Sequence, residues 1–182
     1  MENILLIFLG GVLTSNYALQ SYLGVSTLLG ASKETVKAAV TGIAVTVVTV
    51  LSMLVIWPVQ TFLLAPKGLE YLQTLVFVTI IVTVASLVGA AAKALLKKPL
   101  GVLFPLVALN SAVLGVAIDA AAMTFGQAAL TALAAGLGFL AAMLVFCGVR
   151  SRIEEAAVPK AFRGLPVYLM TAAILSLALF AF

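Results

Sequence analysis

The side chains that could carry chemistry are few, and their types argue against most catalytic sites. The 182-residue chain has no His and a single Cys, Cys147. Without more ligands and bases of these types, this chain alone cannot build a histidine-based metal site, a Ser-His-Asp triad or a disulfide. We therefore predict no catalytic residue and no metal site in this chain, and we interpret Cys147 as an inert buried thiol.

Two asparagines inside long apolar segments are the main polar candidates. Paired glycines precede Asn16, and Pro105 precedes Asn110. Proline removes a backbone hydrogen-bond donor, and glycine permits conformations that a helix does not use. We therefore expect both asparagines beside an interruption of a helix, inside a bundle. There they either satisfy freed backbone groups and pack between helices, or they form a shared polar site near the membrane midplane.

Three hydroxyl residues and one acid are further candidates. Thr46, Thr49 and Ser52 recur every three residues. Their oxygens either bond back to carbonyls of their own helix or ligate a cation, and the first interpretation is favoured. Asp119 falls where a helix is expected to leave the membrane, so it is interpreted as a solvated carboxylate, with an ion-entry role as the alternative.

The elements that must position these residues are transmembrane helices. Hydrophobic residues make up 64% of the chain and charged residues 9%, against roughly 25% charged in a soluble domain. Six segments lack Asp, Glu, Lys and Arg, and each reaches or nearly reaches the roughly 20 residues that a spanning helix needs. The sequence thus predicts an all-α integral membrane protein, a single domain over residues 1–182 with six transmembrane helices. The segments are residues 3–32, 38–66, 71–92, 99–118, 120–149 and 164–182.

The basic residues predict the orientation of these helices. Nine of the ten Lys and Arg residues fall in the first, third and fifth connections, and only Lys67 falls in the others. Cytoplasmic loops carry an excess of Lys and Arg. We therefore predict a multi-pass protein of a bacterial or archaeal cytoplasmic (inner) membrane with both termini outside. The net charge of +4 then reflects topology, and no nucleic-acid partner is expected.

An internal repeat relates the two halves of the chain. Residues 37–56 align without gaps to residues 127–146, and seven of the twenty aligned positions are identical. A three-helix unit has an odd number of spans, so its copy must cross the membrane in the opposite sense. The sequence predicts an inverted repeat of residues 1–92 and 99–182, with interrupted lead helices and a site near the midplane.

These residues resemble the A subunit of the Rnf electron-transport complex and its counterpart NqrE in the sodium-pumping NADH:quinone reductase. The resemblance covers nearly the whole chain in order, and its second half is the more specific. It rests on Ser15–Leu19 (SNYAL), Tyr22–Gly24 (YLG), Leu29–Lys33 (LGASK), Leu103–Leu106 (LFPL), Asn110–Ala117 (NSAVLGVA) and Val158–Gly164 (VPKAFRG).

The resemblance implies a cofactor whose ligands are missing here. In that family a Cys at each helix break, with two from a homologous partner, holds a [2Fe-2S] cluster inside the membrane. The matching positions are Ser26 and Ser111. A serine hydroxyl is a poor substitute for a thiolate. We therefore expect the cluster to be absent or altered, with Ser26, Ser111, Asn16 and Asn110 lining the same cavity without iron.

The leading functional hypothesis is a membrane subunit of an Rnf/Nqr-type ion-translocating oxidoreductase that couples electron transfer to Na⁺ or H⁺ transport. Such a subunit is not catalytic alone. The resemblance implies as partners a homologous membrane subunit of opposite orientation (RnfE/NqrD-like), flavin- and iron-sulfur-bearing subunits, and the lipid bilayer. The alternative is a redox-independent transporter or scaffold subunit built on the same repeat.

Overall fold

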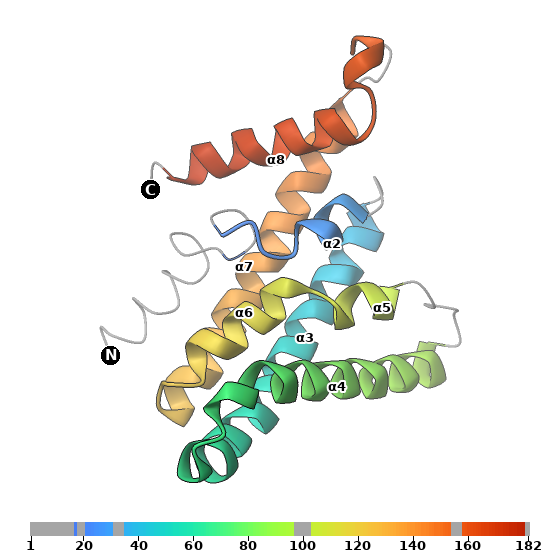
Figure 1. Ribbon diagram of the computed structural model, residues 1–182. Helices are drawn as coiled ribbons and strands as arrows, with labels where there is room; N and C mark the ends of the chain where they lie inside the picture. The colour runs from blue at the N-terminus through green and yellow to red at the C-terminus, as the bar shows by residue number, and fades with distance from the viewer. Residues whose placement is uncertain (1–16, 18–20, 31–34, 97–102, 154–157, 181–182) are drawn as a thin grey trace.

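The computed structural model is all-helical in the part of the chain that it describes, which is residues 17, 21–30, 35–96, 103–153 and 158–180 (Figure 1). Its α-helices are α2 (Val25–Gly30), α3 (Thr35–Val59), α4 (Gln73–Leu96), α5 (Leu103–Ala108), α6 (Ser111–Ala120), α7 (Phe125–Arg152) and α8 (Leu165–Phe180). Between them lie the π-helix η2 (Gln60–Leu64) and the short 3-10 helices η3 (Ala65–Lys67), η4 (Glu70–Leu72) and η5 (Lys160–Phe162).

The helix lengths confirm the all-α membrane class. Three continuous helical stretches are long and apolar enough to cross a bilayer: Thr35–Lys67, Glu70–Ala94 and Phe125–Arg152. The fourth predicted helix is instead two helices, α5 and α6, and the sixth is the 16-residue α8. The first predicted span lies mostly outside the described residues, so the six-span inverted repeat stays a prediction.

Helices α3 and α7 form the centre of the molecule and run antiparallel, side by side (Figure 1). Glycines allow their backbones to approach closely. A Cβ on Gly136 of α7 would lie 2.9 Å from the Cα of Thr46, and one on Gly42 of α3 would lie 3.1 Å from the Cα of Leu140. Small residues at such crossings are the usual means of packing helices in lipid, where no hydrophobic force drives helices together.

The two ends of this helix pair are joined by different contacts. At one end Trp57 Nε1 donates to the carbonyl of Met123 at 2.9 Å, and the Trp57 ring packs edge-on against Phe125. At the other end Arg150 Nη1 donates to the carbonyl of Leu29 at 3.1 Å. The connections after α3 and before α7 therefore meet at one end, while α2 and the end of α7 meet at the other.

Candidate functional site

The interruption predicted at Asn110 is present between α5 and α6. Leu109 is 75% exposed and Asn110 is 2% exposed. Asn110 has an extended backbone, and its side-chain oxygen accepts a hydrogen bond from the backbone N–H of Ala112 at 2.9 Å. This is an N-cap, which satisfies one of the backbone donors left free when a helix begins. Asn110 therefore serves the freed backbone, the first of the two roles expected for it.

A turn with two positive φ angles precedes α2. Tyr22 and Gly24 both have positive φ, +54° and +76°, and the N–H groups of Thr27 and Leu28 then bond to the carbonyl of Gly24 as the helix starts. Only Gly takes such a backbone angle without a steric cost. The position is also crowded, because a Cβ on Gly24 would collide with Asn110 Oδ1 and would lie 2.8 Å from Phe139.

The turn before α2 and the interruption at Asn110 meet in space. The backbone N–H of Gly24 donates to Ser111 Oγ at 2.8 Å, across 87 residues of sequence. Further along, Leu23 packs where a Cβ of Gly115 would be, and the Tyr17 hydroxyl donates to Asp119 Oδ2 at 3.0 Å. Positions 111, 115 and 119 share one face of α6, because residues four apart on a helix are neighbours. The segment that contains Tyr17, Leu23 and Gly24 therefore runs along this face.

Helix α2 is held at both of its ends. The Thr27 hydroxyl, fully buried, donates to the carbonyl of Leu106 in α5 at 3.4 Å. At the other end Arg150 binds the carbonyl of Leu29 and stacks over the ring of Tyr168, with 3.9 Å between Cζ and the ring centroid. A cation at a helix C-terminus is favourable because the helix dipole is negative there. The short helix is thus fixed by contacts with α5, α7 and α8.

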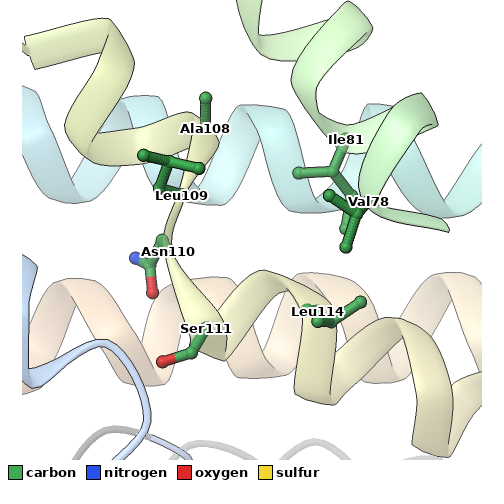
Figure 2. Close-up of a pocket in the computed structure, with 7 residues that line it drawn as sticks. All are labelled: Val78, Ile81, Ala108, Leu109, Asn110, Ser111 and Leu114. Carbon is green, nitrogen blue, oxygen red and sulfur yellow. The ribbon is translucent and has the colours of Figure 1, made fainter. Parts of the chain in front are cut away.

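A cavity of about 160 Å³ opens beside Asn110 and Ser111 (Figure 2). It lies among α4, α5 and α6, and Figure 2 shows the side chains of Leu109, Asn110 and Ser111 along the break that joins the last two helices. The amide nitrogen of Asn110 is buried and has no hydrogen-bond partner among the residues that the structure describes. The other lining residues are apolar: Val78, Ile81, Ala108 and Leu114.

The structure places the predicted site residues as follows. Asn110 and Ser111 contact the break at Gly24, and Ser26 lies two residues after that glycine, in the first turn of α2. Both Ser26 and Ser111 are exposed on this chain. Asn16 lies outside the described residues. Cys147 is 2% exposed on α7, as expected for a buried thiol.

The chemistry of these groups is that of hydroxyls and an amide. In the described part of the chain, no three His, Cys, Asp or Glu residues come together in a way that could hold a metal ion. Iron-sulfur clusters are bound by Cys thiolates, and this chain presents Ser oxygens at positions 26 and 111. The residues present therefore do not fit a cluster.

The favoured interpretation of the other hydroxyls is borne out at two positions. Thr46 and Thr49 donate to the carbonyls of Gly42 and Val45, four residues earlier, at 2.9 and 2.7 Å. Thr46 also bonds to the carbonyl of Gly136 at 2.9 Å. Ser52 Oγ is buried without a hydrogen-bond partner in the described structure. Asp119 is exposed in the last turn of α6, near the helix end predicted for it.

Sequence reasoning missed three contributors to this region. Gly24 enters the sequence analysis only as part of the YLG motif, and its contact with Asn110 is not predicted there. The pairing of Tyr17 with Asp119 joins residues that no local pattern relates. Arg150 was counted only as a topological charge, although it binds the end of α2. The one available signal was the glycine in an otherwise apolar YLG stretch, since a glycine there indicates an unusual backbone angle or a close contact.

The chain is similar to known membrane proteins over nearly its whole length. The family model of the Rnf-Nqr membrane proteins matches residues 4–182. The A subunit of the ion-translocating oxidoreductase complex from Syntrophotalea carbinolica is 37% identical over 187 residues, covering 100% of this chain and 97% of that protein. Proteins with the same name from Yersinia enterocolitica and Edwardsiella ictaluri are 38% and 37% identical over the same shares.

Proposed function

The chain belongs to the Rnf-Nqr family of membrane subunits, and we propose that it is the A-type membrane subunit of an ion-translocating oxidoreductase complex. In this role it couples electron transfer to Na⁺ or H⁺ transport together with other subunits, and it is not catalytic alone. The observation that carries the proposal is the match to relatives of that name across 97% of their length. The all-helical, apolar fold agrees with such a role.

The inverted repeat is part of this proposal. The hydrogen bond from Thr46 to Gly136 joins residues 90 apart, and 90 is also the offset of the gapless alignment of residues 37–56 with 127–146. A residue on a two-fold axis contacts its own equivalent, and positions displaced equally to either side contact each other. Gly42 and Leu140 follow this rule, since each lies four residues from the central pair. These contacts support a pseudo-two-fold axis through the crossing of α3 and α7.

The predicted orientation is supported by the contacts at the two ends of the α3–α7 pair. The Trp57–Met123 bond lies near the second and fourth connections, which carry one basic residue. The Arg150–Leu29 bond lies near the first and fifth connections, which carry six. Cysteine probes at positions 35 and 156 should then react only from the cytoplasm, and a probe at 68 only from outside. The reverse pattern of labelling would contradict the orientation.

The proposed interface with a homologous subunit lies where the two breaks meet. Ser26 and Ser111 are exposed on this chain beside contacts that fix the backbone around them, so they can face a partner subunit. Of the four predicted residues, Asn110 and Ser111 line the described cavity. In this proposal Ser26 and Asn16 face the same interface, which holds no cluster ligated by this chain. An inner-membrane complex with flavin- and iron-sulfur-bearing subunits supplies the redox groups.

The serine hydroxyls at positions 26 and 111 also agree with the alternative function. A chain without thiolates there fits a redox-independent transporter or scaffold as readily as an electron carrier. Purification of the tagged chain from its native membrane separates the two. Recovery of a homologous membrane subunit with flavin- and iron-bearing subunits supports the oxidoreductase, and recovery of the chain without them refutes it.

The cluster is tested by iron analysis and paramagnetic resonance of the reduced complex. The unmodified complex should lack a [2Fe-2S] signal assignable to this site. The Ser26→Cys, Ser111→Cys double variant restores the two missing thiolates, and a signal that appears only there means that the cavity persists without its cofactor. A stoichiometric signal from this site in the unmodified complex would overturn the proposed loss.

A further inference from the structure

Charge is distributed unequally between the two sides of the chain. The first, third and fifth connections carry nine basic and three acidic residues, a net charge of +6. The N-terminus and the second and fourth connections carry one basic and three acidic residues, a net charge of −2. Positive charge on the cytoplasmic side sets the topology. Topology depends on the number of these charges, however, and not on what surrounds each of them.

The connection between α7 and α8 holds part of this charge in an ordered turn. Residues 158–165, named here the α7–α8 turn, contain the 3-10 helix η5. Arg163 Nε donates to the carbonyl of Val158 at 2.9 Å and closes the turn, and Gly164, with a φ of +83°, then leads the chain into α8. Side chains three residues apart on a 3-10 helix lie one above the other. Lys160 and Arg163 are therefore on the same side of the turn.

Apolar side chains are exposed beside these charges. Phe162 is 49% exposed and Leu165 is 61% exposed, and the basic residues Arg152 and Lys160 are exposed as well. Figure 1 shows the turn beyond the end of α7, away from the centre of the helix packing. At a membrane surface, apolar and aromatic side chains can enter the hydrocarbon while basic side chains reach the headgroups. The α7–α8 turn has both kinds of side chain side by side.

We propose that the α7–α8 turn, with Arg152 at the end of α7, binds the headgroup of an anionic phospholipid. The basic side chains attract the net negative charge, which a zwitterionic headgroup lacks, and Phe162 and Leu165 lie against the acyl chains. The hydrogen bond that closes the turn orders it in advance, so binding loses little conformational freedom. The site is independent of the proposed function, because lipid binding requires neither transport nor a redox partner.

The test measures which lipid lies next to one residue at a time. Trp57 is the single tryptophan and lies at the opposite end of the α3–α7 pair, so the unmodified chain reports on that end. The Trp57→Phe, Phe162→Trp variant reports on the turn. Each full chain is reconstituted in phosphatidylcholine bilayers that contain increasing fractions of brominated phosphatidylglycerol or brominated phosphatidylcholine. Bromine quenches tryptophan fluorescence at short range, so the two quenching curves give the local preference for the anionic lipid.

Phosphatidylglycerol should be preferred at position 162 and not at Trp57. Each Lys or Arg near the surface contributes about fivefold to such a preference. Lys160→Gln should therefore lower the preference at position 162 about fivefold, and addition of Arg152→Gln should lower it by a similar factor. Lys67→Gln is the matched control, because Lys67 is also exposed on a 3-10 helix near a glycine of positive φ, at the opposite end. This variant should leave the preference at position 162 unchanged.

A second reporter guards against a local effect of the new tryptophan. Leu165→Trp, combined with Trp57→Phe, places the probe at the other exposed apolar residue of the turn and should give the same preference. Equal preferences at positions 57 and 162 would refute the site. An equal effect of Lys67→Gln and Lys160→Gln would mean that the overall charge of the chain attracts the lipid. Loss of quenching by both lipids when the chain is assayed with its copurified subunits would mean that a partner protein covers the turn instead.

Discussion

Substitution of Gly24 by alanine tests whether the turn at Gly24 packs against Asn110 as closely as the structure indicates. Two costs arise. The positive φ of +76° penalises any residue with a Cβ by about 1–2 kcal/mol. The new methyl group also collides with Asn110 Oδ1 and Phe139, and overpacking of this kind costs about 1–3 kcal/mol. We therefore expect Gly24→Ala to lower the free energy of unfolding by about 2–5 kcal/mol.

Gly68→Ala is the matched control. Gly68 has a similar φ of +63°, but nothing lies within 4 Å of the position of its Cβ, so only the backbone cost of about 1–2 kcal/mol applies. Unfolding of both variants in mixed micelles can be followed by the fluorescence of Trp57, the single tryptophan. The difference in the free energy of unfolding between the two variants measures the cost of the collision at position 24. If Gly24→Ala were no less stable than Gly68→Ala, the close approach of Gly24 to Asn110 would be refuted.

Two further substitutions test the helix crossing and the cap. Gly136→Ala should destabilise the chain by about 1–3 kcal/mol through overpacking, whereas Gly148→Ala on the same helix, with open space around it, should not; equal micelle unfolding curves would contradict the crossing. Asn110→Leu removes the cap of α6, worth about 1 kcal/mol, and should impair ion transport by the reconstituted complex more than Thr49→Val, which removes only a bond within one helix. Equal transport by these two variants would assign Asn110 to packing alone.

Some features of the site were predictable because their causes are local. The apolar segments predicted helices since a spanning helix is a property of about 20 consecutive residues. The break at Asn110 was predictable because Pro105 and the polar pair that follows disfavour a continuous helix there. The hydrogen bonds from the Thr46 and Thr49 hydroxyls to carbonyls of their own helix were predictable for the same reason, because the acceptor lies only four residues earlier. The family was recognisable because its motifs are contiguous.

The sequence by itself determined the helical membrane class, the break at Asn110 and the serine hydroxyls at positions 26 and 111. Only the tertiary structure decided that Gly24 touches Asn110 and Ser111, that Tyr17 bonds to Asp119, and that Arg150 holds the end of α2. It also decided which atom of the Asn110 amide makes a hydrogen bond. Its oxygen caps α6, and its nitrogen has no hydrogen-bond partner in the described part of the chain. These features depend on how the helices pack across 86 to 121 residues of sequence, and no periodicity or composition within one segment encodes a contact at that separation.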